Sequence, residues 1–249
     1  MGSSFFYASK LWLMKTKNFF FLVLIFVFSF AGFAKAQDCK LFFPSKEGAL
    51  IELTQYDKKG SPTSYSTQKV ISRTETAKGL NIRYQQIIKD AKDDKTFTTE
   101  MGVKCENGKF YVDMNELFKG MNLESYQSAP EMQVTIDGDA LFYPSDLHAG
   151  STLPDGKVTA KVNTGGFTMV TMYVNLTNRK CEGIETITTP AGTFECYKIT
   201  QDVEAKAIMK VLSTDISWLA EGVGLVKSET WDKKGKLMGS SQLTKFENQ

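Results

Sequence analysis

The stretch LIELTQYDKKGSPTSYST, residues Leu50–Thr67, contains a complete β-hairpin signal. An apolar and β-branched run ends at Tyr56, the residues Asp57–Gly60 form a polar break, and a run rich in Ser, Thr and Tyr follows. Asp at the first and Gly at the fourth position are typical of a type I turn followed by a left-handed Gly, which matches the twist of the strands. The stretch predicts two antiparallel strands joined at a surface tip.

The same four letters, Asp-Lys-Lys-Gly, return in TWDKKGKLMGSS, residues Thr230–Ser241. This copy also lies between strand-like runs, Gly224–Glu229 before it and Lys236–Met238 after it. We interpret both copies as hairpin tips. A paired lysine clamp is the functional alternative, and it would require an anionic partner.

Other turn signals divide the chain at hairpin spacing. Four breaks flanked by strand-like runs are Asn107–Gly108, Asp137–Gly138, Gly165–Gly166 and Pro190–Gly192. We count ten or eleven strands. Short strands at such spacing favour a mostly antiparallel β fold, either an open barrel or a pair of curved sheets. We expect a single β domain over residues 37–249.

One short helix is expected over Met114–Lys119. Asp113–Glu116 resembles a capping box, and Met114, Leu117 and Phe118 follow helical spacing on one face. So short an apolar helix has too little area to be stable unless it covers something. We expect it to lie against the sheet.

The strand-like run Phe167–Thr177 is apolar on both faces. Alternate residues of a strand share a face, so Phe167, Met169 and Tyr173 are expected together on one side. The other side carries Val170, Met172, Val174 and Leu176. Such a strand is either central and covered on both sides or lines a cavity on one side. In a carrier, Phe167, Met169 and Tyr173 would line the concave face, and the short helix would plug it.

The first 36 residues resemble a secretory signal peptide. Lys15 and Lys17 precede the apolar run Phe19–Phe33, and Ala34–Ala36 supplies the small-x-small pattern that signal peptidase cleaves. The run is too short to be a good membrane span. Cleavage after Ala36 predicts a protein of the Gram-negative periplasm, or a secreted one, that does not span the membrane.

Two details of the N-terminal segment allow other interpretations, one of its start and one of its processing. Met14 is the natural start, because a compact charged region and apolar run follow it directly. Cys39 suggests a lipoprotein as the rival interpretation. The residues before it, Ala36–Asp38, lack the apolar and small residues of a lipidation signal.

The charge balance changes once this segment is removed. The whole chain has 30 Lys and Arg against 28 Asp and Glu, and four of the lysines lie in the first 36 residues, which contain no acid. The mature chain therefore has 26 basic and 28 acidic residues, a net charge of −2. It lacks the basic excess that is typical of proteins that bind nucleic acid or anionic membranes.

Four cysteines lie in the exported part of the chain. An even number in an oxidising compartment favours two disulfides, for which three pairings exist. We predict Cys181–Cys196 and Cys39–Cys105. Metal binding is not expected, because no two cysteines are close in sequence and His148 is the only histidine.

The residues offer little for catalysis. His148 lies in a loop sequence without a nucleophile of recognisable context, and Gly222–Gly224 lacks the third glycine and the helix of a dinucleotide site. We predict no enzyme activity and no cofactor. Catalytic carboxylate pairs assemble only in space, so they stay open at this point.

Several longer phrases resemble the TapB-like family of exported Bacteroidota proteins. They are FFPSKEGALIELTQYDKKG (42–60), KCENGKFYVDM (104–114), IETITTPAGTFECYKI (184–199) and WLAEGVGLVKSETWDKKGKL (218–237). The most specific pieces are Thr189–Phe194 and Gly222–Val226. The phrases are also similar to lipoprotein-carrier-like β proteins, and this second resemblance implies an open barrel of about eleven strands that holds acyl chains against short helices. Neither resemblance implies catalytic residues.

Three classes of function follow. The first is a non-enzymatic periplasmic binder or carrier of a lipid or other apolar ligand. The second is a structural or envelope-assembly protein that binds envelope proteins through its sheet. The third, a hydrolase, lacks an identifiable nucleophile.

Overall fold

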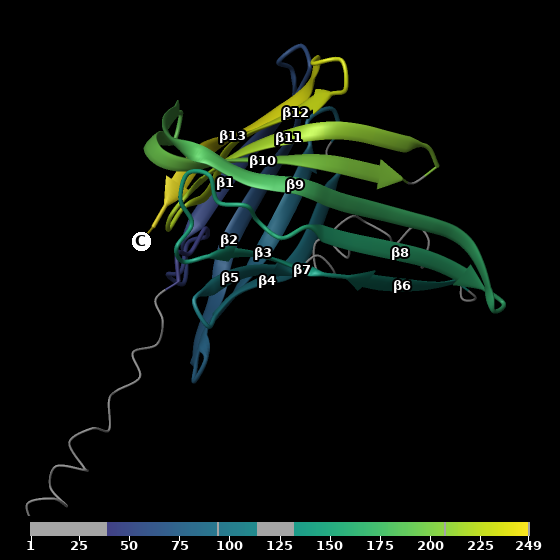
Figure 1. The fold of residues 1–249 in the computed structure, drawn as a ribbon, viewed down its shortest axis with the longest axis horizontal. Helices are drawn as coiled ribbons and strands as arrows, with labels where there is room; N and C mark the ends of the chain where they lie inside the picture. Colours follow the sequence, from purple (N-terminus) through teal and green to yellow (C-terminus); the bar gives the residue numbers. More distant parts are fainter. Residues whose placement is uncertain (1–38, 94, 114–131, 207, 249) are drawn as a thin grey trace, which may run out of the picture. The chain divides into compact units, whose positions relative to one another are not determined.

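The computed structural model describes residues 39–93, 95–113, 132–206 and 208–248. They form thirteen strands of one antiparallel sheet, in the order β6-β8-β9-β10-β11-β12-β13-β1-β2-β3-β4-β5-β7 (Figure 1). The strands are β1 Leu50–Asp57, β2 Pro62–Thr76, β3 Gly79–Asp90, β4 Thr96–Glu106, β5 Lys109–Asp113, β6 Met132–Gly138, β7 Ala140–Pro144, β8 Gly156–Thr164, β9 Phe167–Thr189, β10 Gly192–Lys206, β11 Lys210–Ala220, β12 Gly224–Asp232 and β13 Leu237–Glu247. The sheet curls into a nearly closed barrel with one unsealed seam.

The antiparallel open barrel is therefore confirmed, with more strands than predicted. No helix occurs among the described residues. The predicted helix Met114–Lys119 lies outside them. Nor does any described helix meet the length and hydropathy required to cross a membrane.

Both Asp-Lys-Lys-Gly segments are hairpin tips, as predicted. In the first, Asp57 accepts hydrogen bonds from the backbone amides of Lys59 (2.8 Å) and Ser61 (2.9 Å), and Gly60 has a φ of 81°. These amide bonds hold the pKa of Asp57 below its ordinary value. The second tip, at Asp232, repeats the same contacts and joins β12 to β13. Asp stabilises the turn because its carboxylate accepts hydrogen bonds from backbone amides that the tight bend leaves without other partners.

The predicted hairpin at Asp137–Gly138 is wrong. β6 and β7 do not pair with each other: β6 pairs with β8, and β7 pairs with β5. Gly138 does not take a positive φ. Its missing side chain instead lets β6 approach β8, since a Cβ there would lie 2.8 Å from Val158 Cγ2. The Asp139 amide bonds the Lys157 carbonyl at 2.8 Å. The chain thus crosses the seam and leaves β6 and β7 as the two edges of the sheet.

The buried side chains form two clusters of unequal size. The larger includes Phe42, Tyr84, Phe110 and Leu243, and Phe42 makes edge-on ring contacts with Phe110 (6.1 Å). The smaller consists of Leu141, Val158, Ala160 and Leu176, with partly buried neighbours around it. The interior is therefore tightly packed at one end, and a separate apolar cluster lies under β6, β8 and β9.

One of the two predicted disulfides is present. Cys39 and Cys105 are bonded, with their Cα atoms 6.0 Å apart. Cys181 and Cys196 are free and buried, which corrects the second pairing. In the β9–β10 ladder Cys181 lies opposite Ile199, three residues from Cys196. Three residues of strand span roughly 10 Å, which exceeds the Cα separation of about 7 Å that a disulfide can bridge.

Candidate functional site

β10 links the two clusters along a single inner face. Tyr197 and Ile199 pack with the larger cluster, and Val203 packs against the smaller one. These odd-numbered residues point to the same side of the strand. Gln201 lies between Ile199 and Val203, and its Oε1 accepts a hydrogen bond from the buried Arg179 at 3.1 Å. We take the inner face on this side of the barrel as the candidate site.

The apolar part of this site surrounds the smaller cluster. Five of its side chains are only partly buried: Val134, Ile136, Met172, Val174 and Val203. Each is an aliphatic or thioether group without a polar atom that needs a partner. They form an apolar surface on the concave side of the curled sheet and are only partly buried.

The predicted lining residues of β9 lie on the wrong face of the strand for this surface. Phe167 is 79% exposed and Met169 is 61% exposed, whereas their even-numbered neighbours pack inward. The Tyr173 hydroxyl donates to Glu204 Oε1 at 2.7 Å, and Glu204 also pairs with Lys210 at 2.8 Å. Polar partners thus hold Tyr173 on the outside. The other predicted lining residues, Met114, Leu117 and Phe118, lie outside the described residues.

A group of polar residues, which we call the polar layer, lies on neighbouring strands β9 to β12. It consists of Arg179, Gln201, Asp215 and Thr230, in which Gln201 and Thr230 are the ladder partners of Asp215 on β10 and β12. Arg179 is 1% exposed and donates through Nε to Gln201 Oε1 (3.1 Å) and through Nη1 to the Pro154 carbonyl (2.6 Å). These bonds compensate part of the cost of burying a charge.

Asp215 has the most perturbed environment in this layer. Burial raises the pKa of its carboxyl above the ordinary value of 3.8, and a hydrogen bond with Thr230 opposes that rise. Its Oδ1 atom is buried and has no hydrogen-bond partner. The sequence reasoning missed this residue. The sequence does contain a sign of it, because the polar residues Ser213, Asp215 and Ser217 alternate along β11 and therefore share one face of the strand.

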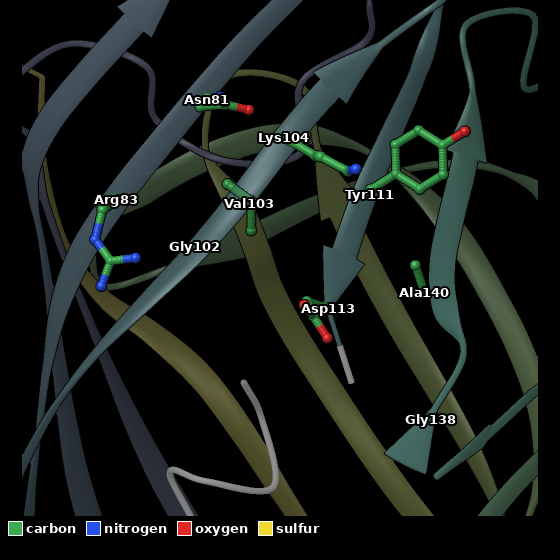
Figure 2. Close-up of a pocket in the computed structure, with 9 residues that line it drawn as sticks. All are labelled: Asn81, Arg83, Gly102, Val103, Lys104, Tyr111, Asp113, Gly138 and Ala140. Carbon is green, nitrogen blue, oxygen red and sulfur yellow. The ribbon is translucent and has the colours of Figure 1, made fainter. Parts of the chain in front are cut away.

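A second candidate is a pocket of about 360 Å³ on the outer face (Figure 2). It is lined by Asn81, Arg83, Gly102, Val103, Lys104, Tyr111, Asp113, Gly138 and Ala140. Its two cations already have partners: Arg83 pairs with Glu100 at 3.3 Å, and Lys104 pairs with Glu106 at 3.1 Å. These exposed pairs leave no obvious anion site in the pocket.

His148 takes part in a local turn. Its ring Nδ1 lies 2.7 Å from the Asp146 carbonyl and 3.1 Å from Ser151 Oγ. The His148 backbone amide donates to the same Oγ at 3.1 Å. The Ser151 hydroxyl therefore stabilises the turn, and no carboxylate of the described residues is hydrogen-bonded to the ring as in a catalytic triad. No group of three metal-ligating side chains occurs among the described residues.

Comparisons with known proteins agree with this fold. A family model described as DUF3108-like matches residues 46–243. A crystal structure from Bacteroides fragilis, described as an exported protein with a YmcC-like fold, matches with 24% identity and a TM-score of 0.68 over 84% of this chain and 100% of its own. A Parabacteroides distasonis structure, described as a lipoprotein, matches with 23% identity and a TM-score of 0.69 over 85% of this chain and 100% of its own. No curated protein matches. The narrower resemblance to the TapB-like family stays a prediction.

Proposed function

We propose that this chain, which belongs to the DUF3108-like family, is an exported, non-enzymatic protein that binds or carries a lipid or other apolar ligand in its barrel. The supporting observation is the concave apolar surface of Val134, Ile136, Met172, Val174 and Val203, which is only partly buried. Burial of an acyl chain there contributes about 0.8 kcal/mol per methylene. Eight methylenes thus gain about 6 kcal/mol before the cost of ordering the ligand.

The cellular location of the protein is part of the same proposal. A signal peptide cleaved after Ala36 would release the chain into the periplasm or the medium. The Cys39 sulfur is bonded to Cys105. A sulfur in a disulfide cannot also carry a lipid thioether, so the structure favours an unlipidated exported protein over lipidation at Cys39. The intact mass of the exported protein tests this point.

The ligand proposal is tested by a matched pair of variants on β9. Met172→Glu puts a charge on the concave surface, and Thr171→Glu puts the same charge on the exposed outer face one residue away. We expect Met172→Glu to weaken binding of a fluorescent fatty acid by at least about tenfold, because an unpaired charge on an apolar surface is costly. Thr171→Glu should bind like the wild type.

Native mass spectrometry of protein purified from its own envelope provides a second measurement. A co-purifying lipid that is absent from the Met172→Glu variant supports the proposal. Equal probe binding by the two variants, or an apo mass together with no probe binding by the wild type, contradicts it.

Envelope assembly through the sheet is the second candidate. It is favoured by the seam, because β6 and β7 each pair on one side only within the described sheet. Open strand edges are templates for strand addition by a partner. Cross-linking through a cysteine placed at Thr135 of β6 would capture such a partner in the envelope, whereas a cysteine at Thr67 of the central strand β2 should not.

A further inference from the structure

Five of the hairpin turns lie at the same end of the barrel. They join β1–β2, β3–β4, β8–β9, β10–β11 and β12–β13, and we call them the hairpin rim. The ladders bring their strand ends together: Lys206 pairs with Lys210 and Tyr173, Ser213 with Asp232, Asp57 with Gly239, and Ser64 with Asp90. The loops of β1–β2 and β12–β13 stand side by side at the top of Figure 1.

One part of the rim is apolar and exposed. Ile208 and Met209, in the β10–β11 turn, are 93% and 76% exposed. Phe167 and Met169, at the start of β9, and Val211, at the start of β11, are also exposed. Tyr173 is the ladder partner of Lys206, so Phe167 and Met169 lie beyond the β10–β11 turn, on the projecting end of the β8–β9 hairpin. Each of these two neighbouring hairpins thus exposes large apolar side chains next to one another, whereas such residues normally occur singly on a protein surface. No described residue covers them.

The other part of the rim carries lysines that form no ion pair of hydrogen-bond length with a described carboxylate. Lys58, Lys59, Lys233 and Lys234 lie in the two Asp-Lys-Lys-Gly tips and are exposed. The acids of these tips, Asp57 and Asp232, accept hydrogen bonds from backbone amides of their own turns. Both tips therefore present their ammonium groups to solvent, next to each other.

The two parts of the rim are contiguous. The ladder partner of Ser213 on β11 is Asp232, so the lysine tip of β12–β13 begins beside the β10–β11 hairpin. The Ala91 amide donates a hydrogen bond to the Thr63 carbonyl at 3.0 Å, which places the β3–β4 turn beside the β1–β2 hairpin. Cations thus lie beside protruding apolar groups along a continuous edge.

We propose that the hairpin rim docks on the surface of an anionic phospholipid bilayer. Ile208, Met209, Phe167 and Met169 would enter the interface, while the lysines would contact lipid phosphates. Protruding apolar groups flanked by lysines have the composition of interfacial membrane anchors. The net charge of −2 for residues 37–249 does not reveal this cluster of lysines, because only the fold brings them together at one end of the barrel. Docking does not depend on a ligand in the interior.

The test is co-sedimentation of the exported protein with vesicles of phosphatidylcholine, with and without phosphatidylglycerol. We expect binding to the anionic vesicles and loss of binding at high salt, since exposed charges are screened. The variant Lys58→Gln/Lys59→Gln/Lys233→Gln/Lys234→Gln should bind at least about tenfold more weakly. Ile208→Ser/Met209→Ser should lose a comparable amount at unchanged charge.

A matched control removes charge at the opposite end of the barrel. Lys78→Gln/Lys104→Gln replaces lysines beside the β2–β3 and β4–β5 turns and should bind like the wild type. Equal binding by the rim variants and the wild type, or no binding of the wild type to anionic vesicles, overturns the proposal. Binding of the fluorescent fatty acid without vesicles separates the two proposals: it should persist in every rim variant even if vesicle docking fails.

Discussion

Removal of the Cys39–Cys105 disulfide should destabilise the protein substantially. The bond joins positions 66 residues apart. Closing a loop of this length removes about 4 kcal/mol of chain entropy from the unfolded state at 25 °C. Stabilities of folded domains are generally about 5–15 kcal/mol. The double variant Cys39→Ser/Cys105→Ser is therefore expected to lose a large share of its stability.

Urea unfolding followed by tryptophan fluorescence measures this loss. Wild-type protein should show a lower midpoint in reductant, whereas the double variant should be insensitive to it. Cys181→Ala/Cys196→Ala serves as the control, because both of these thiols are free. That variant should keep the full response to reductant. A loss below about 1 kcal/mol on removal of the disulfide would refute the loop-entropy reasoning.

Three further results are expected. Burial raises the pKa of the Cys196 thiol to about 11 and also raises the pKa of the Cys181 thiol. Both thiols should therefore resist iodoacetamide in the native protein and react after unfolding. Rapid labelling of the native protein would contradict this expectation. Because burial raises the native pKa of Asp215 above 3.8, its ionisation costs stability as pH rises through the window from 3.8 to that raised value. Asp215→Asn should therefore have a higher urea midpoint than wild type at pH 7, with the difference fading below pH 3.8, and a lower midpoint at pH 7 would refute the assignment. Gly79→Ala should lower the thermal midpoint and reduce the free energy of unfolding by at least about 2 kcal/mol, because the new Cβ would collide with the Cys105 carbonyl. An unchanged thermal midpoint would show that β3 and β4 can separate at this position.

The sequence by itself determined the turns and hence the class of fold. Asp57–Gly60 and Asn107–Gly108 needed no distant contact to be recognised, because their side chains and positive φ angles satisfy local backbone requirements. Each such turn fixes one antiparallel neighbour. A chain of these turns yields an antiparallel sheet whatever its final curvature.

The tertiary structure decided which strands and faces meet. Gly138 resembled a turn residue, yet it serves the close approach of β6 to β8, which only the closure of the barrel requires. Cys181 and Cys196 lie on two strands that pair with each other, but the β9–β10 register keeps them apart. Both faces of β9 are apolar in sequence, and only its neighbours show that Met172 faces inward.

The candidate site belongs to the same tertiary level. Asp215 is one polar residue in an ordinary strand, and it becomes unusual only because the folded sheet buries its carboxyl group. Each Asp-Lys-Lys-Gly segment could be predicted as a hairpin turn from its own sequence, but the two turns lie next to each other only because β1 pairs with β13. Local propensity depends on a few neighbouring residues, whereas burial and proximity depend on the whole sheet, so the turns could be predicted and the site could not.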